Sequence, residues 1–282
     1  MDMPLRSNNK DESVRTAFRD LRALIDTDPE SAKAGLSELA DAGCAEAMVC
    51  LGVMCADGDE KDKEMVPGLF RRASELGDSS GTRNMGYIYA LGLCVEQDKN
   101  VAAEWYKRAA LEGNPRAQCN IGVLYRYRNG VPQDLAEAAK WYSMSAANGY
   151  SRGQTNLGIL MLEGKGIEKD PVTAARLFME SGSPRAHFRL ATQYLEGNGV
   201  RPDNKKAMEL LDESHSRGYA KASALLAKLM EDIDKDRALE LYMHAASNGD
   251  PDAAEWLSLN GFTIPERIPR KRRRRTDTAQ KG

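Results

Sequence analysis

The chain has 282 residues, of which 41% are hydrophobic and 29% charged, so it is long enough to bury a sizeable core. No stretch approaches the roughly 18 consecutive apolar residues of a membrane-spanning helix, and residues 1–14 contain no apolar run typical of a secretory signal. The net charge of −2 combines a segment at 270–275 that carries +6 with a remainder of −8 (−2 minus 6). An acidic body with a basic tail is informative about partners.

Two helices are predicted before residue 44. Residues 1–10 are polar, and we expect them to be disordered. Apolar residues then recur at helical spacing, which predicts a first helix over residues 11–25, and Pro29 begins a second apolar pattern. We interpret residues 11–43 as a degenerate unit that caps the N-terminal end of a helical stack, because nothing packs against such an end.

Residues 117–149 contain the clearest helical hairpin of the chain. An apolar stripe through Ile121 has helical spacing, a turn at Gly130 interrupts it, and a second stripe contains Trp141 and Tyr142. The Ile121-Gly122 pair recurs at steps of 34, 36, 36, 33, 36 and 31 residues, which is typical of a helical solenoid. The other copies of this pair are Leu51-Gly52, Met85-Gly86, Leu157-Gly158, Leu190-Ala191, Leu226-Ala227 and Leu257-Ser258.

The shared pattern, A-x-x-x-L-G-x-x-Y-x-x-G-x-G-V-x-x-D-x-x-x-A-x-x-W-Y-x-x-A-A-x-x-G, resembles the Sel-1-like repeat, a relative of the tetratricopeptide repeat. The resemblance covers about three quarters of the chain. It implies an all-α fold: a right-handed α-solenoid of about six helix-turn-helix repeats with N- and C-terminal capping helices. The implied solenoid spans residues 11–261, with units 47–77, 81–113, 117–149, 153–182, 186–218 and 222–249, a capping helix at 253–260 and a tail at 262–282 that we expect to be disordered.

Members of this family serve as adaptors that hold other proteins together, and few are enzymes in the repeat region. The chain itself contains no HExxH, Walker or Rossmann motif. The Gly-x-Gly turns at Gly164 and Gly197 follow no strand, so they predict tight interhelix turns and not phosphate sites. We therefore expect a non-enzymatic scaffold without a cofactor, with an enzyme of unrecognised type as the weaker alternative.

The cysteines and histidines predict neither disulfides nor a metal site. Some secreted members of the family pair the two helices of each unit through a disulfide, but the later repeats of this chain have no cysteine. We interpret the five cysteines as core residues in a reducing compartment, which predicts a cytoplasmic protein. The three histidines do not lie beside a cysteine pair, so we expect no metal site. The cysteines are Cys44, Cys50, Cys55, Cys94 and Cys119.

A ladder of polar residues is the best candidate for partner binding. A cation precedes the opening small residue in successive repeats, and an asparagine precedes the Leu-Gly pair. In tetratricopeptide domains these positions line the concave surface, so stacked cations beside amides would suit an extended acidic or C-terminal peptide. The alternative is that the repeat simply favours asparagine and that each arginine pairs with an acid of the adjacent unit. The candidate residues are Asn84, Arg116, Asn120, Arg126, Arg152, Asn156, Arg185 and Lys221.

The basic run in the tail has three interpretations. It could bind nucleic acid or another anionic surface such as a membrane, with the steep salt dependence of counterion release. It could be a nuclear-localisation signal, which would place the protein in the nucleus. It could be a solubilising segment that touches the acidic body. No aromatic residue interleaves it, so base stacking is not indicated. The run consists of Arg270, Lys271, Arg272, Arg273, Arg274 and Arg275.

Overall fold

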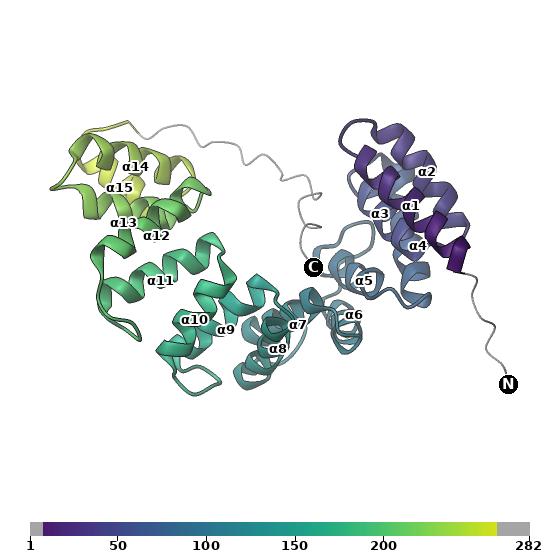
Figure 1. Ribbon diagram of the computed structural model, residues 1–282, viewed down its shortest axis with the longest axis horizontal. Helices are drawn as coiled ribbons and strands as arrows, with labels where there is room; N and C mark the ends of the chain where they lie inside the picture. The colour runs from purple at the N-terminus through teal and green to yellow at the C-terminus, as the bar shows by residue number, and fades with distance from the viewer. Residues whose placement is uncertain (1–7, 264–282) are drawn as a thin grey trace. The chain divides into compact units, whose positions relative to one another are not determined.

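The computed structural model describes residues 8–263, and the regular elements in that range are α-helices (Figure 1). This confirms the expected all-α repeat fold. The chain divides into two compact units, residues 1–134 and 135–282, which are described separately. The basic run at 270–275 lies outside the described residues, so its three interpretations stay predictions.

In the first unit each helix packs on the next one along the chain, and α3 also contacts α5. The unit buries a core between successive helices, as expected for a repeat array in which each element contacts its neighbours. Its helices are α1 (Asn8–Leu24), α2 (Pro29–Asp41), α3 (Ala45–Cys55), α4 (Glu60–Glu75), α5 (Ser79–Leu91), α6 (Lys99–Leu111) and α7 (Pro115–Tyr127).

The second unit follows the same plan, with each helix packed on its successor. Its largest fully buried side chains include Phe178, Leu190 and Leu211. The helices are α8 (Leu135–Ala147), α9 (Ser151–Glu163), α10 (Pro171–Ser181), α11 (Pro184–Glu196), α12 (Asn204–Ser216), α13 (Ala220–Met230), α14 (Lys235–Ser247) and α15 (Pro251–Leu259).

Glycine in the Leu-Gly slot allows close approach of the two helices of one repeat. A Cβ added at Gly158 on α9 would lie 2.7 Å from the ring of Phe178 on α10, and one at Gly86 on α5 would lie 2.7 Å from the ring of Tyr106 on α6. Both rings are buried. The aromatic slot is therefore part of the core, as the sequence predicts, and glycine opposite it is a packing requirement.

Aspartates cap the second helix of the repeats. The carboxylates of Asp98, Asp170 and Asp203 accept hydrogen bonds from backbone N–H groups in the first turns of α6, α10 and α12. These aspartates occupy the D position of the repeat pattern. Their hydrogen bonds satisfy backbone donors that an isolated helix start would leave without a partner.

Two helix boundaries differ from the sequence predictions. Helix α1 begins at Asn8, so residues 8–10 are helical and not part of a disordered segment. Their polarity led to that expectation, but polar residues are compatible with an outer helical turn. Helix α15 begins at Pro251 and not at 253, because Asp250 accepts a hydrogen bond from the Ala253 N–H at 3.0 Å and proline suits a first helical position.

The five cysteines are free thiols, and Cys55 and Cys119 are buried. Cys94 has a φ of 61°, the left-handed region in which the equivalent loop positions hold Gly166 (72°) and Gly199 (79°). Within residues 8–263, no helix has both the length and the apolar character needed to cross a bilayer.

Candidate peptide-binding pocket

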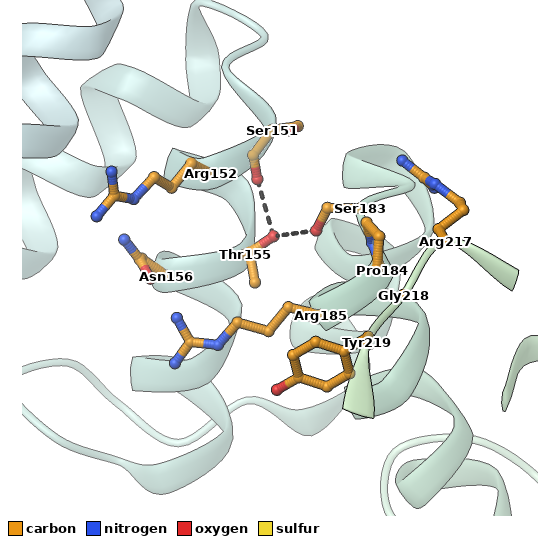
Figure 2. A pocket seen from close by; sticks show the side chains of 10 residues that line it. All are labelled: Ser151, Arg152, Thr155, Asn156, Ser183, Pro184, Arg185, Arg217, Gly218 and Tyr219. Atoms are coloured by element: carbon orange, nitrogen blue, oxygen red, sulfur yellow. Dashed lines mark hydrogen bonds between the residues drawn. The ribbon is translucent and has the colours of Figure 1, made fainter. Parts of the chain in front are cut away.

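The second unit contains a pocket of about 350 Å³ between α9, the start of α11 and the turn that joins α12 to α13 (Figure 2). Three of its ten lining residues are arginines and none is acidic. We call it the arginine pocket. It is lined by Ser151, Arg152, Thr155, Asn156, Ser183, Pro184, Arg185, Arg217, Gly218 and Tyr219.

Three predicted residues meet in this pocket. Arg152 and Asn156 are four residues apart on α9, so they share one helix face. Arg185 comes from the first turn of α11, and only Gly182 and Ser183 separate α11 from α10. Figure 2 shows the three side chains extending to the same side, with the Asn156 amide between the two guanidinium groups.

A cluster of hydroxyl groups holds α9 against the start of α11. The Thr155 hydroxyl donates to the Ser151 carbonyl oxygen at 2.8 Å and lies 2.8 Å from Ser181 Oγ and 3.0 Å from Ser183 Oγ. Ser183 also caps α11 by accepting from the Ala186 N–H at 3.2 Å. These bonds span 28 residues of sequence and fix Arg152 and Arg185 relative to each other.

The far wall of the pocket comes from the α12–α13 turn. Arg217 Nη1 donates to the carbonyl oxygen of Gly182 at 2.5 Å. Tyr219 is the last residue of the turn, and its ring lies 5.4 Å from the ring of Phe188 on α11, centroid to centroid. The turn is therefore attached to the start of α11 by a hydrogen bond and by an aromatic contact.

The pocket presents cationic groups beside a buried amide. Among the described residues, neither Arg152 nor Arg185 has an ion-pair partner, so the alternative that each pairs with an acid of the adjacent unit is not observed for these two. Asn156 is 4% exposed. Guanidinium groups with free donors bind carboxylates and phosphates in a bidentate manner, so the pocket suits an anionic group.

The remaining predicted residues do not line the pocket. Lys221 lies in the first turn of α13 and is exposed. The other four belong to the first unit: Asn84 on α5 is 3% exposed and accepts a hydrogen bond from Arg83, while three lie on α7. Those three are Arg116, Asn120 and Arg126, all half-buried.

Arg217, Tyr219 and the hydroxyl cluster were not predicted from the sequence. The sequence signal that could have indicated them is the stretch Ser181-Gly182-Ser183-Pro184, which replaces the usual Ala-Ala-x-x-Gly of the repeat and shortens the turn before α11. The repeat pattern cannot predict that Arg217 and Tyr219 line the pocket, because both lie in a turn between repeats, where the pattern specifies no residue type. Nothing in the pattern indicated that Arg217 reaches back to Gly182.

A second polar cluster lies between α12, α13 and α14, next to the α12–α13 turn. His215 on α12 and His244 on α14 each place Nδ1 close to the Ser223 hydroxyl of α13, at 2.9 and 3.0 Å, and the two rings are 4.5 Å apart. Burial lowers the pKa of both imidazoles, and mutual repulsion lowers that of His215 further. The sequence had placed these histidines apart, and the fold brings them together. Within residues 8–263 no group of three metal-binding side chains is present.

The fold and pocket define a helical-repeat protein of the solenoid class. The family model described as Sel1 repeat matches residues 79–114, 115–150, 151–178 and 184–218, consecutive along the chain. The chain therefore contains four consecutive Sel1 repeats between residues 79 and 218, as the resemblance predicted. Sel1 repeat proteins are commonly protein-interaction scaffolds.

Similar proteins agree with this assignment. A Sel1 repeat protein from Oxalobacter formigenes is 29% identical with a TM-score of 0.62, covering 67% of this chain and 84% of that one. A protective antigen of uropathogenic Escherichia coli with an SLR fold is 28% identical with a TM-score of 0.53, covering 83% of this chain and 61% of the antigen. An uncharacterized protein of Neisseria meningitidis serogroup B is 36% identical over 72 residues, which are 26% of this chain and 15% of that protein.

Proposed function

We propose that this protein is a non-enzymatic adaptor and that its arginine pocket binds an acidic segment of a protein partner. The observation that carries the proposal is the meeting of Arg152 and Arg185, both without an acidic partner among the described residues, around the buried Asn156. In a solenoid the shared residues of the repeats form the scaffold, and the variable residues at the helix edges are available for recognition.

Each lining group has a role in binding an extended peptide. The two guanidinium groups would hold a carboxylate of a side chain or a C-terminus through charge-assisted hydrogen bonds. The Asn156 amide lies between them and adds a polar, uncharged group to this wall of the pocket. Tyr219 supplies an aromatic surface for a neighbouring apolar residue. The preferred ligand is thus an acidic residue next to an apolar one.

The lining is less suited to catalysis. Its hydroxyl groups, including those of Thr155 and Ser183, hydrogen-bond to one another and to backbone, and no histidine or carboxylate lines the pocket to act as their general base. Binding through the tail stays a separate possibility on residues outside the described range, and a salt titration of nucleic-acid binding tests it.

The test is selection from a displayed peptide library with the full chain as bait, followed by fluorescence anisotropy of the selected peptides. We expect enrichment of peptides with an acidic residue beside an apolar one, and weaker binding at higher salt. Arg152→Glu with Arg185→Glu should abolish binding while leaving the helical circular-dichroism spectrum unchanged. Lys221→Glu is the matched control, because it reverses a charge at the same repeat position outside the pocket. Binding that survives the double reversal would contradict the proposal.

A further inference from the structure

The last hairpin, α13–α14, lacks the long loop of the two hairpins before it. Residues 164–170 and 197–203 join α9 to α10 and α11 to α12, whereas only residues 231–234 join α13 to α14. The loop at 197–203 lies on the start of α10, because a Cβ at Gly199 would meet the Pro171 carbonyl oxygen at 2.5 Å. The four-residue turn is too short to lie back on α12 in the same way.

An apolar hollow lies beside this short turn. It has a volume of about 270 Å³ and is formed by α12, α13 and α14. Its apolar walls are Met208, Leu226, Met230 and Leu241. Methionine side chains adapt to the shape of an inserted group, so this hollow can accept one aliphatic side chain.

Acidic residues surround the hollow. Glu209 and Asp212 line it, and Asp232 and Asp236 are exposed in the adjoining turn and at the start of α14. Arg237 lines it as well, but it pairs with Asp212 at 3.5 Å and with an acid of its own helix. Within residues 8–263 the carboxylates of Glu209, Asp232 and Asp236 form no ion pair, although Glu209 interacts electrostatically with Lys206 of its own helix. We call these three residues the acidic rim.

The chain leaves the described range close to this surface. Phe262 stacks on Trp256 with 6.2 Å between ring centroids, and Trp256 stacks on Tyr242 at 4.0 Å. The Tyr242 hydroxyl donates to the carboxylate of Glu231. Glu231 is the next residue after Met230, which lines the hollow. Two ring contacts and one hydrogen bond therefore connect the last described residues to the turn beside the hollow.

We propose that residues 264–275 of the same chain dock on this surface, with Ile268 in the apolar hollow and the basic run on the acidic rim. The seven residue steps from Thr263 to Arg270 can span roughly 23 Å when the chain is extended. The run carries +6, and the rim offers carboxylates that belong to no ion pair. Single exposed ion pairs are weak, but several charges on a short tether act at high effective concentration. The docked tail would have its charge masked from external anionic surfaces.

Zero-length carbodiimide cross-linking of the full chain tests this proposal, because the run contains one lysine, Lys271, whose amine can form an amide with a carboxylate in contact with it. Mass spectrometry should identify links from Lys271 to Glu209, Asp232 or Asp236. The yield should not depend on protein concentration, and it should fall in roughly 0.5 M salt, which screens exposed charges over a few ångströms.

Variants of the full chain decide between the outcomes. Glu209→Gln, Asp232→Asn and Asp236→Asn together should lower the total yield of Lys271 links roughly fivefold, as expected when several paired charges are removed. The control set, Glu38→Gln, Glu64→Gln and Glu96→Gln, removes exposed acids of the first unit and should leave the yield unchanged. Links that survive in the rim variant, that form only with first-unit acids, or that increase with protein concentration as contacts between two copies would overturn the proposal.

The apolar half of the contact has its own test. Ile268→Ser should lower the cross-linking yield and increase the rate at which trypsin cleaves the basic run, because the inserted side chain anchors the segment. Ile264→Ser is the matched control within the tail and should have a smaller effect. Equal effects of the two substitutions, or no effect of Ile268→Ser, would overturn the placement of Ile268 in the hollow.

Discussion

Arg217 donates a hydrogen bond to the carbonyl oxygen of Gly182 across 35 residues of sequence, at 2.5 Å. Gly182 ends α10 in a left-handed conformation with a φ of 54°, so its carbonyl belongs to the two-residue turn before α11. The bond thus connects the turn that carries Tyr219 to the turn that positions Arg185. Two sides of the arginine pocket are held together by this contact.

Replacement of Arg217 should loosen the pocket without unfolding the chain. Arg217 is exposed, so Arg217→Ala should cost less than about 1 kcal/mol of stability. We expect faster amide hydrogen exchange in residues 216–220 and weaker binding of acidic peptides. Arg217→Lys keeps the charge with a different donor geometry, so it should restore binding only in part. If exchange in this turn is the same in Arg217→Ala and the parent chain, the hydrogen bond does not hold the turn.

A methyl group at Gly158 should destabilise the second unit. The added Cβ would lie 2.7 Å from the Phe178 ring, so Gly158→Ala forces the α9–α10 pair apart at an expected cost of about 1–3 kcal/mol. Gly68→Ala is the control, because no atom lies within 4 Å of its added Cβ. It should stabilise α4 by about 0.5–1 kcal/mol through helix propensity. Urea unfolding followed by circular dichroism measures both changes, and a destabilising effect of equal size at Gly68 would refute the packing argument.

Relief of the left-handed backbone at Cys94 should stabilise the first unit. A non-glycine residue in this region costs about 1–2 kcal/mol, and the greater entropy of glycine in the unfolded chain offsets part of the gain. Cys94→Gly should therefore raise stability by about 0.5–1 kcal/mol. Cys50→Gly, within helix α3, should lower it by a similar amount. Thermal unfolding of the two variants gives the comparison, and a loss of stability in Cys94→Gly would show that its side-chain contacts outweigh the backbone strain.

The histidine cluster behind the α12–α13 turn should make the second unit sensitive to acid. Burial lowers the pKa of His215 and His244 below their ordinary value of 6.5, with Arg237 also lowering that of His215 and Asp212 opposing it. The unfolded chain then binds more protons as the pH falls through 6.5, so stability is full above that value and is lost below it. The geometry of the cluster also favours unprotonated histidines. The Ser223 hydroxyl has a single hydrogen, which it can donate to one unprotonated Nδ1. If both histidines were protonated, the two imidazolium rings would repel each other.

Urea unfolding at a series of pH values between 8 and 5 measures this effect. The parent chain should lose stability as the pH falls below about 6.5, and the pH-dependent loss should be smaller in His215→Asn with His244→Asn, whose amides do not titrate. His187 is a third contributor, because burial lowers its pKa too, although Glu213 at 3.2 Å partly opposes this. An unchanged pH dependence in the double variant would exclude the cluster as its source.

Much of the fold can be predicted from the sequence, because every repeat needs the same residue types at the same positions. The glycine opposite each core aromatic ring, the aspartate before the second helix and the positive φ of the loop glycine recur at one period, so each copy supports the others. Boundaries at the ends of the array were less accurate, because α1 begins in polar residues and the Leu257-Ser258 pair indicates that α15 exists but not at which residue it begins.

The site was predicted only in part, for a related reason. Arg152, Asn156 and Arg185 lie at repeat positions, so their common face follows from the register. Arg217 and Tyr219 lie in a turn, and their contacts depend on the shortened connection between α10 and α11. The same register also suggested Lys221, which does not line the pocket. Repetition predicts what is shared among units, whereas this pocket depends on where one unit departs from the others.

The most direct test of the central claim is a titration of the full chain with a selected acidic peptide, followed through the Nε–Hε resonances of its arginine side chains by NMR. We expect saturable shifts at Arg152 and Arg185, with exposed arginines such as Arg176 on α10 unchanged. Shifts confined to arginines outside the arginine pocket, with Arg152 and Arg185 unchanged at saturation, would contradict the claim.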